Sequence, residues 1–407
     1  MGGTKSTMII TLPSVEYHAR LAKVREALHQ ARLDAFCVTS STSILYLTGF
    51  RHSPTERPVV LVVSADGEPG ILVPQLEEEH LPHRVPWLKT VQVYPEYPDL
   101  RHPLRFLSDL LARMGLSSAR LGADSSGYGA SGYRGPMIGE VLGGAQLTLL
   151  PHLIEELRMI KAPAEIELIR SSVVFGNMQQ RFIQEITAPG KTEIEISLIA
   201  CAEGVRMLFE ELGHLGIPYV GQDNGSIPVA GGLIAGPATA LPHPLDTNRP
   251  IEKGDVIISW SGGAEFDGHS SELERTMILG VPTPEQRRVF GIMLAAQQIA
   301  FETIRPGIPC SAVDDAVWRY AERMGALHMR RHHTGHGRGY QGHEMPFFDR
   351  GDHTILQPGM VLSVEPGFYL PGLGGFRHSD TVVVTETGCE VLTNYPRELD
   401  VLTIPAW

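Results

Sequence analysis

The first 155 residues alternate between one helical pattern and several short, wholly apolar runs. Apolar residues recur at helical spacing from Val15 to Gln30, and short apolar runs of the kind that form buried strands follow. These strand-like runs are Ala35 to Ser40, Val59 to Ser64, Gly70 to Val73 and, after a helical stretch from Pro103 to Met114, Ala119 to Gly122. The alternation predicts a small α/β domain over residues 1–155.

Beyond residue 155 the pattern changes to long amphipathic helices and scattered strands. A long amphipathic helical region begins within Glu155 to Arg170 and continues past Pro163. Capping-box pairs predict further helix starts at Thr192 with Glu195, at Thr283 with Gln286 and, more loosely, at Ser311 with Asp314. Strand-like runs are Asp255 to Trp260, Met277 to Leu279, Met360 to Val364 and Thr381 to Thr385. We therefore expect an α+β domain with antiparallel strands over residues 156–407.

Composition narrows the class of partner. The chain has 407 residues, enough for two cores, and a formal net charge of -12, which argues against nucleic acid or an anionic membrane as the main partner. A small molecule or a dipeptide fits this charge better. The four cysteines lack CxxC spacing, and no apolar run approaches the roughly 18 residues of a membrane span. We expect a cytoplasmic protein.

Histidines gather in one glycine-rich segment, HHTGHGRGYQGHEMP. His336 and His343 stand seven residues apart, with glycines at 335, 337, 339 and 342 that let the backbone come close to a ligand. Two imidazoles projecting into one cavity would suit a metal or a polar substrate. The competing interpretation is a solvated surface loop.

Three glutamates are placed where a carboxylate needs a partner. Glu365 ends the run PGMVLSVEPGFY, which otherwise reads as a buried strand, so its charge requires a cation or a donor. Glu272 and Glu274 are two apart and lie on one face if the segment is extended. Two carboxylates side by side repel each other unless they share a cation or one of them faces solvent. The competing interpretation is therefore a solvated acidic edge of the sheet.

The order and spacing of these segments resemble the pita-bread family, which contains methionine aminopeptidases, Xaa-Pro dipeptidases, aminopeptidase P and creatinase. The matching segments are SILYLTGF, LRMIKAPAEIELIR, GDVIISWSGGAEFDGHSSELERT, TGHGRGYQGHEMP, PGMVLSVEPGFY and GGFRHSDTVVVTETGCEVLT. The resemblance implies a creatinase-type amino-terminal α/β domain over 1–155 and an α+β pita-bread catalytic domain over 156–407. It also implies a homodimer.

The resemblance implies an altered metal site. Metallopeptidases of the family hold two metal ions with Asp, Asp, His, Glu and Glu. The corresponding positions of this chain are Ser261, Glu272, His336, Glu365 and Ser379. A serine hydroxyl is a poor substitute for a carboxylate around a hard divalent cation, so two bound ions are not expected.

Creatinase, the metal-independent member, is similar in having the run Leu273 to Thr276. That resemblance implies that Glu274 and Glu365 bind a cationic nitrogen group while His243 shuttles the proton. Arg57 resembles the arginine that one subunit lends to its partner's site for a substrate carboxylate. Two departures weaken the likeness, because Phe347 replaces the arginine that follows the second histidine and Thr55 replaces an aromatic residue.

Two activities are therefore predicted. The first is a creatinase-like hydrolase of a C–N bond in an amidino, ureido or amide compound with a carboxylate, needing no cofactor. Its catalytic residues would be His243, Glu274, Glu365 and His343, with His336, Arg57 and Glu272 binding substrate. The alternative is an Xaa-Pro dipeptidase or aminopeptidase with one Mn²⁺, Co²⁺ or Zn²⁺ held by Glu272, His336 and Glu365. A third possibility is a binding protein that has lost catalysis.

Overall fold

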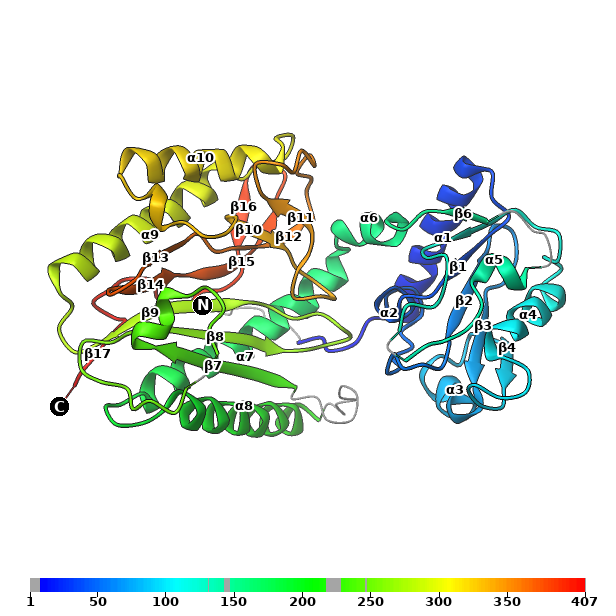
Figure 1. Ribbon diagram of the computed structural model, residues 1–407, viewed down its shortest axis with the longest axis horizontal. Helices are drawn as coiled ribbons and strands as arrows, with labels where there is room; N and C mark the ends of the chain where they lie inside the picture. Colours follow the sequence, from blue (N-terminus) through cyan, green and yellow to red (C-terminus); the bar gives the residue numbers. More distant parts are fainter. Residues whose placement is uncertain (1–7, 131, 143–146, 217–227, 246, 407) are drawn as a thin grey trace. The chain divides into compact units, whose positions relative to one another are not determined.

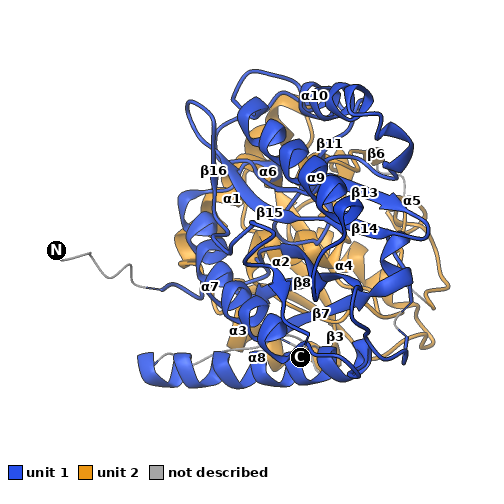
Figure 2. Cartoon of the chain, turned by 90° about the vertical axis from the view of Figure 1, so that its left-hand side faces the viewer, with its two compact units in different colours: residues 1–11, 159–407 blue, residues 12–158 orange. Residues whose placement is uncertain are grey.

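The computed structural model describes residues 8–130, 132–142, 147–216, 228–245 and 247–406 of the chain. These residues form two compact units. One unit runs from Leu12 to Arg158, and the other combines the segment up to Thr11 with the chain from Met159 onward (Figure 2). The division falls three residues after the end of the predicted first domain. Each unit has its own sheet and its own core.

The first unit is built on a mixed sheet of six strands in the order β4-β3-β2-β1-β5-β6. β1 pairs antiparallel with β2, and β2 with β3, while the three remaining pairs are parallel. The strands are β1 (Ala35–Val38), β2 (Val60–Ser64), β3 (Gly70–Pro74), β4 (Thr90–Tyr94), β5 (Leu121–Ala123) and β6 (Leu147–Leu149). The first three are buried along their whole length, which is why they read as continuous apolar runs.

Helices cover this sheet. They are α1 (Ser14–Ala31), α2 (Ser41–Thr48), α3 (His80–Arg84), α4 (Leu107–Arg113), α5 (Ile138–Val141) and α6 (Leu153–Met159), with 3₁₀ turns η1 (Gln75–Glu77) and η2 (Pro103–Phe106). Leu107, Leu110 and Leu111 of α4 are buried against the sheet residues Val60 and Leu72. The α/β class predicted for this part of the chain is confirmed.

The second unit is an α+β domain around a sheet whose order is β11-β10-β12-β15-β9-β8-β7, with β16 beside β15 and β17 beside β9. Its strands are β7 (Val229–Ala235), β8 (Val256–Ala264), β9 (Leu273–Leu279), β10 (Gly335–Gly337), β11 (Glu344–Phe348), β12 (Val361–Val364), β15 (Ser379–Val384), β16 (Cys389–Val391) and β17 (Thr403–Ile404). A separate ribbon pairs β13 (Gly367–Leu370) with β14 (Gly374–Arg377). The main pairings are antiparallel, as predicted.

Four long helices flank the strands of this unit. They are α7 (Pro163–Ile186), α8 (Glu193–Leu215), α9 (Pro284–Thr303) and α10 (Cys310–Arg323). The 3₁₀ turn η3 (Gly236–Ala240) lies between β7 and β8, and η4 (Leu327–Met329) lies between α10 and β10. In Figure 1, α7 and α8 lie along β7 and β8, whereas α9 and α10 lie on the other side of the sheet. No helix of the described residues is long and apolar enough to cross a membrane.

Two of the three predicted helix starts are confirmed. Thr192 accepts a hydrogen bond from the amide of Glu195, and Thr283 forms a full capping box with Gln286. The third prediction is wrong, because α10 already begins at Cys310 after Pro309 and Ser311 lies inside the helix. The carboxylate of Asp314 accepts hydrogen bonds from Arg330 and Thr334 instead of contributing to a cap.

Candidate active site

Five neighbouring strands bring the predicted site residues into one row. Ser261 lies in β8, Glu274 in β9 and His336 in the middle of β10, while Glu365 directly follows β12 and Ser379 opens β15. Ser379 pairs with Glu274 across the β9–β15 ladder, and His336 pairs with Ser363 across β10–β12. Residues more than 100 positions apart in the sequence therefore meet because antiparallel pairing places them opposite each other.

Glu272, His336 and Glu365 form the centre of the site and are called here the ligand cluster. Their donor atoms all lie within 4.8 Å of one another. His336 Nε2 lies 3.4 Å from Glu365 Oε1 and 3.9 Å from Glu272 Oε2. The other ring nitrogen, Nδ1, lies 3.0 Å from the carbonyl oxygen of Gly337, so Nδ1–H donates there and Nε2 is the ring nitrogen that faces the carboxylates.

Burial and charge act in opposite directions on the cluster. Burial disfavours the charged imidazole, but the Glu365 and Glu272 carboxylates outweigh it and raise the pKa of His336. Burial by itself would raise the pKa of Glu365, whereas His336 and Arg377 together hold that pKa at about 2. Glu365 is thus ionised at neutral pH, as a metal ligand has to be.

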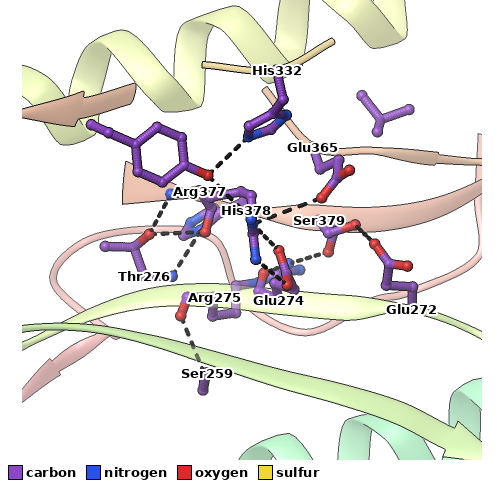
Figure 3. A network of polar contacts seen from close by, with 12 residues as sticks. Ser259, Glu272, Glu274, Arg275, Thr276, His332, Glu365, Arg377, His378 and Ser379 are labelled. Carbon is purple, nitrogen blue, oxygen red and sulfur yellow. Dashed lines mark hydrogen bonds and ion pairs between the residues drawn. The ribbon is translucent and has the colours of Figure 1, made fainter. Parts of the chain in front are cut away.

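Two side chains fix the orientation of Glu272. Ser379 Oγ donates to Glu272 Oε1 at 2.7 Å, and Arg338 Nη1 donates to Glu272 Oε2 at 2.8 Å. The Glu272 amide also donates to Thr381 Oγ1 at 2.8 Å. Figure 3 shows Ser379 and Glu272 facing each other at the edge of the network.

Glu274 is already paired within the chain. Arg377 donates to both of its carboxylate oxygens, at 2.5 and 2.7 Å, and also lies 3.7 Å from Glu365 Oε2 (Figure 3). Burial raises the pKa of Glu274 to about 7, against the opposing charge of Arg377. The guanidinium further donates to the Tyr369 hydroxyl at 3.1 Å, which lies 2.8 Å from His332 Nε2. A cationic substrate group would have to displace Arg377 to reach Glu274.

His343 of the glycine-rich segment stacks on His336. The rings of His336 and His343 are 3.7 Å apart at 17°, and His343 remains accessible from solvent. Partial burial and the neighbouring His336 lower the pKa of His343, so the ring is neutral at pH 7 and offers a nitrogen to a bound molecule. Phe347 lies opposite His336 on β11 and packs near His333.

The two serines that stand at metal-ligand positions point to protein partners. Ser261 Oγ donates to Gln179 Oε1 of α7 at 2.7 Å, and Ser379 is bonded to Glu272. The three remaining donors, two carboxylates and an imidazole, suit one divalent cation with an open position. They form the one group of possible ligands found among the described residues, and the neighbouring Glu274 is bonded to Arg377, so the site offers no second ligand set.

Besides Glu274 and His343, two predicted residues are not members of the ligand cluster. His243 is exposed in the loop that follows η3, and η3 itself is tied to β14 through a hydrogen bond from the Gly375 amide to Thr239. Arg57 belongs to the first unit, where its guanidinium bonds to Glu56 and Glu96. The catalytic role of His243 and the substrate-binding role of Arg57 stay predictions.

Two arginines of the site were missed by sequence reasoning. Arg338 and Arg377 each neutralise a glutamate, and neither was among the predicted site residues. A signal was present, because two glutamates on one strand face require a cation, and both arginines stand in the same motifs as His336 and Ser379. The sequence does not tell which carboxylate each arginine contacts.

Comparisons with known proteins cover almost the whole chain. The model of metallopeptidase family M24 matches residues 168–386, and that of the creatinase/prolidase N-terminal domain matches residues 20–160. The chain is 30% identical over 392 residues to the probable dipeptidase PepE of Mycobacterium tuberculosis, covering 95% of this chain and 97% of the relative.

Solved structures agree with these matches. Dipeptidase PepE from Mycobacterium ulcerans superimposes with a TM-score of 0.79 at 28% identity, covering 97% of this chain and 100% of that one. The Xaa-Pro dipeptidase from Bacillus anthracis superimposes with a TM-score of 0.78 at 25% identity, covering 94% of this chain and 99% of that one. These likenesses favour the predicted peptidase over the predicted creatinase-like activity, and they give no support to the expectation that no cofactor is needed.

Proposed function

This chain belongs to metallopeptidase family M24, whose members are hydrolases of C–N bonds, and from that premise we propose that it is an Xaa-Pro-type dipeptidase with a single divalent cation. Glu272, His336 and Glu365 would hold the cation. The names of the relatives support the substrate class, since they include dipeptidases and an Xaa-Pro dipeptidase.

One observation carries the proposal. His336 Nε2 is buried without a hydrogen-bond partner among the described residues, yet it faces two carboxylates at 3.4 and 3.9 Å. A buried polar atom without a partner costs about 1–3 kcal/mol, so it is retained where something else satisfies it. A divalent cation between the imidazole and the two carboxylates would satisfy all three donors.

The cation would supply Lewis-acid polarisation of the scissile carbonyl group. The chain supplies position and protons. Glu365, ionised because its pKa is about 2, stays a ligand across the whole physiological range. His343, neutral and stacked on His336, presents a ring nitrogen that can hydrogen-bond the substrate. Arg377 keeps Glu274 in place, which prevents this carboxylate from competing for the cation.

The proposal is tested with chelator-treated protein reloaded with Mn²⁺, Co²⁺ or Zn²⁺ and offered Leu-Pro, Leu-Ala and creatine. We expect cleavage of Leu-Pro only after a cation is restored, and a loss of more than about 100-fold in His336→Ala, because the change removes a ligand. His333→Ala is the matched control, since this neighbouring histidine lies outside the ligand cluster. Hydrolysis of creatine by the metal-free protein would contradict the proposal.

A further inference from the structure

The guanidinium of Arg338 is buried beside the ligand cluster. Only 9% of its side chain is exposed. Nη1 donates to Glu272 Oε2 at 2.8 Å and to the carbonyl of Gly342 at 3.0 Å. Nη2 donates to the carbonyl of Ser271 at 2.7 Å and to Ser270 Oγ at 3.1 Å. Four acceptors on two chain segments therefore hold the group in one place.

A charge held in this way is permanent. A guanidinium does not deprotonate in proteins, and its rigid fork fits acceptors in one plane. Nη1 and Nη2 face the segment that leads into β9, while Nη1 also reaches back to the loop that carries His343. Arg338 thus places a positive charge beside Glu272 whatever the pH.

The oxygen that Arg338 contacts is the one that faces the proposed cation. Glu272 Oε2 accepts from Arg338 at 2.8 Å and lies 3.9 Å from His336 Nε2. The remaining oxygen, Oε1, accepts from Ser379. Glu272 therefore divides its negative charge between a fixed cation and the ligand cluster.

We propose that Arg338 is a built-in cation that takes the place of a second metal ion next to Glu272, so that the site holds one divalent cation and holds it weakly. The inference rests on the single-cation function proposed above. It accounts for two features together, since two ligand positions of the family are serines here and a buried guanidinium lies beside Glu272. Like charges repel strongly at this range in a buried site, so the guanidinium lowers the affinity for a divalent ion.

Metal titration of chelator-treated full-length protein tests the inference. We expect the unmodified protein to bind one Mn²⁺ per chain by calorimetry, and Arg338→Gln to bind Mn²⁺ at least about tenfold more tightly, because a positive charge is removed. Arg338→Lys keeps the charge and is expected to stay within about threefold of the unmodified protein. Arg330→Gln is the matched control, since Arg330 is a buried arginine of the same segment that is bonded to Asp314.

Each outcome separates the inference from a purely structural role. Loss of an arginine that only ties segments together would leave Mn²⁺ affinity unchanged or weaker, and that result for Arg338→Gln would overturn the inference. Two ions bound by the unmodified protein would overturn it as well. Arg338→Met, which fills the space with an unbranched apolar chain, is expected to show the same gain if Arg338→Gln does not fold.

The same titration distinguishes the inference from the proposed function. If the unmodified protein binds no Mn²⁺ while Arg338→Gln does, the single-cation function fails and the role of Arg338 stands. If neither binds Mn²⁺, both are overturned.

Discussion

At the scale of single residues, each glutamate of the site is paired with a basic side chain. Glu272 is bonded to Arg338, Glu274 to Arg377, and Glu365 lies beside His336. Burying an unpaired carboxylate costs several kcal/mol, so these pairs allow three glutamates to lie in one buried site. Removing one member of a pair is therefore expected to cost more than removing the same residue from the surface.

Glu274→Gln tests this expectation. The change leaves Arg377 buried with only the more distant Glu365 as a counter-ion, at 3.7 Å. We expect the free energy of unfolding to fall by about 3 kcal/mol, as when one partner of a buried pair is lost. Urea denaturation measures it, with Glu285→Gln in the exposed pair with Arg288 as the control that should change little. An equal effect of the two variants would be inconsistent with this account.

Sequence reasoning located the ligand cluster but not its counter-ions. Glu272, His336 and Glu365 were grouped in advance because each belongs to a recognisable motif. Arg338 and Arg377 also belong to those motifs, but an arginine side chain reaches several possible acceptors, and the choice depends on how strands meet. Glu274 was therefore assigned to a substrate cation, whereas in the fold its carboxylate is taken by Arg377.

At the scale of elements, a helix start was predicted correctly where the sequence carried a full set of capping residues. Thr283 is followed by Pro284 and Gln286, and the helix begins there as predicted. At Ser311 the same reasoning failed because the cap of α10 is Pro309, two residues before the predicted one, so the serine falls inside the helix. The pairing of β9 with β15 and of β10 with β12 joins segments far apart in the sequence, and the sequence analysis predicted antiparallel strands without their partners.

Thr283→Ala tests how much the cap of α9 contributes. Thr283 Oγ1 accepts from the Gln286 amide, and the Thr283 amide donates to Gln286 Oε1. Loss of the first bond is expected to lower the free energy of unfolding by about 1 kcal/mol. Thr387→Ala, in an exposed turn, serves as the comparison. A change below about 0.3 kcal/mol in Thr283→Ala would show that packing alone sets the start of the helix.

At the scale of the whole molecule, the chain divides into two units with separate cores. The predicted boundary after residue 155 rested on one change of pattern, and the units divide after Arg158. A homodimer and a cytoplasmic location stay predictions. The reason given for a dimer was that Arg57 would serve a partner's site, but in this structure Glu56 and Glu96 of the same unit engage it.

Calorimetry should resolve the two units. All three residues of the ligand cluster lie in the second unit, so Mn²⁺ at 100 times its Kd is expected to stabilise that unit alone by about 2.7 kcal/mol. The transition of the first unit should keep its temperature. His336→Ala is expected to abolish the shift, and movement of both transitions together would contradict independent units.

Acid should weaken the first unit through His52. Its imidazole is buried, stacks on Phe50 at 5.5 Å and has no hydrogen-bond partner among the described residues. Burial lowers the pKa of His52 to about 4, with His80 adding to the effect. The unfolded chain takes up the proton near pH 6.5, so stability is full above that pH and falls as the pH drops towards 4.

Protonation of His52 is expected to lower the free energy of unfolding by up to about 3 kcal/mol. His52→Leu is expected to flatten the dependence between pH 6.5 and 4, as measured by urea denaturation at several pH values. His83→Leu, an exposed histidine of the same unit, should leave the slope as it is. An unchanged slope in His52→Leu would rule out this histidine as the source.

The pairing of every site glutamate with a cation of the chain has a consequence for how the protein is made. Where metal ligands repel one another until an ion arrives, the polypeptide cannot mature without it, as in small zinc domains. Here Arg338, Arg377 and His336 balance the carboxylates from within. On the proposed function, we therefore expect folding to be independent of metal supply: the chain would reach its native state without an ion and become active once one is bound.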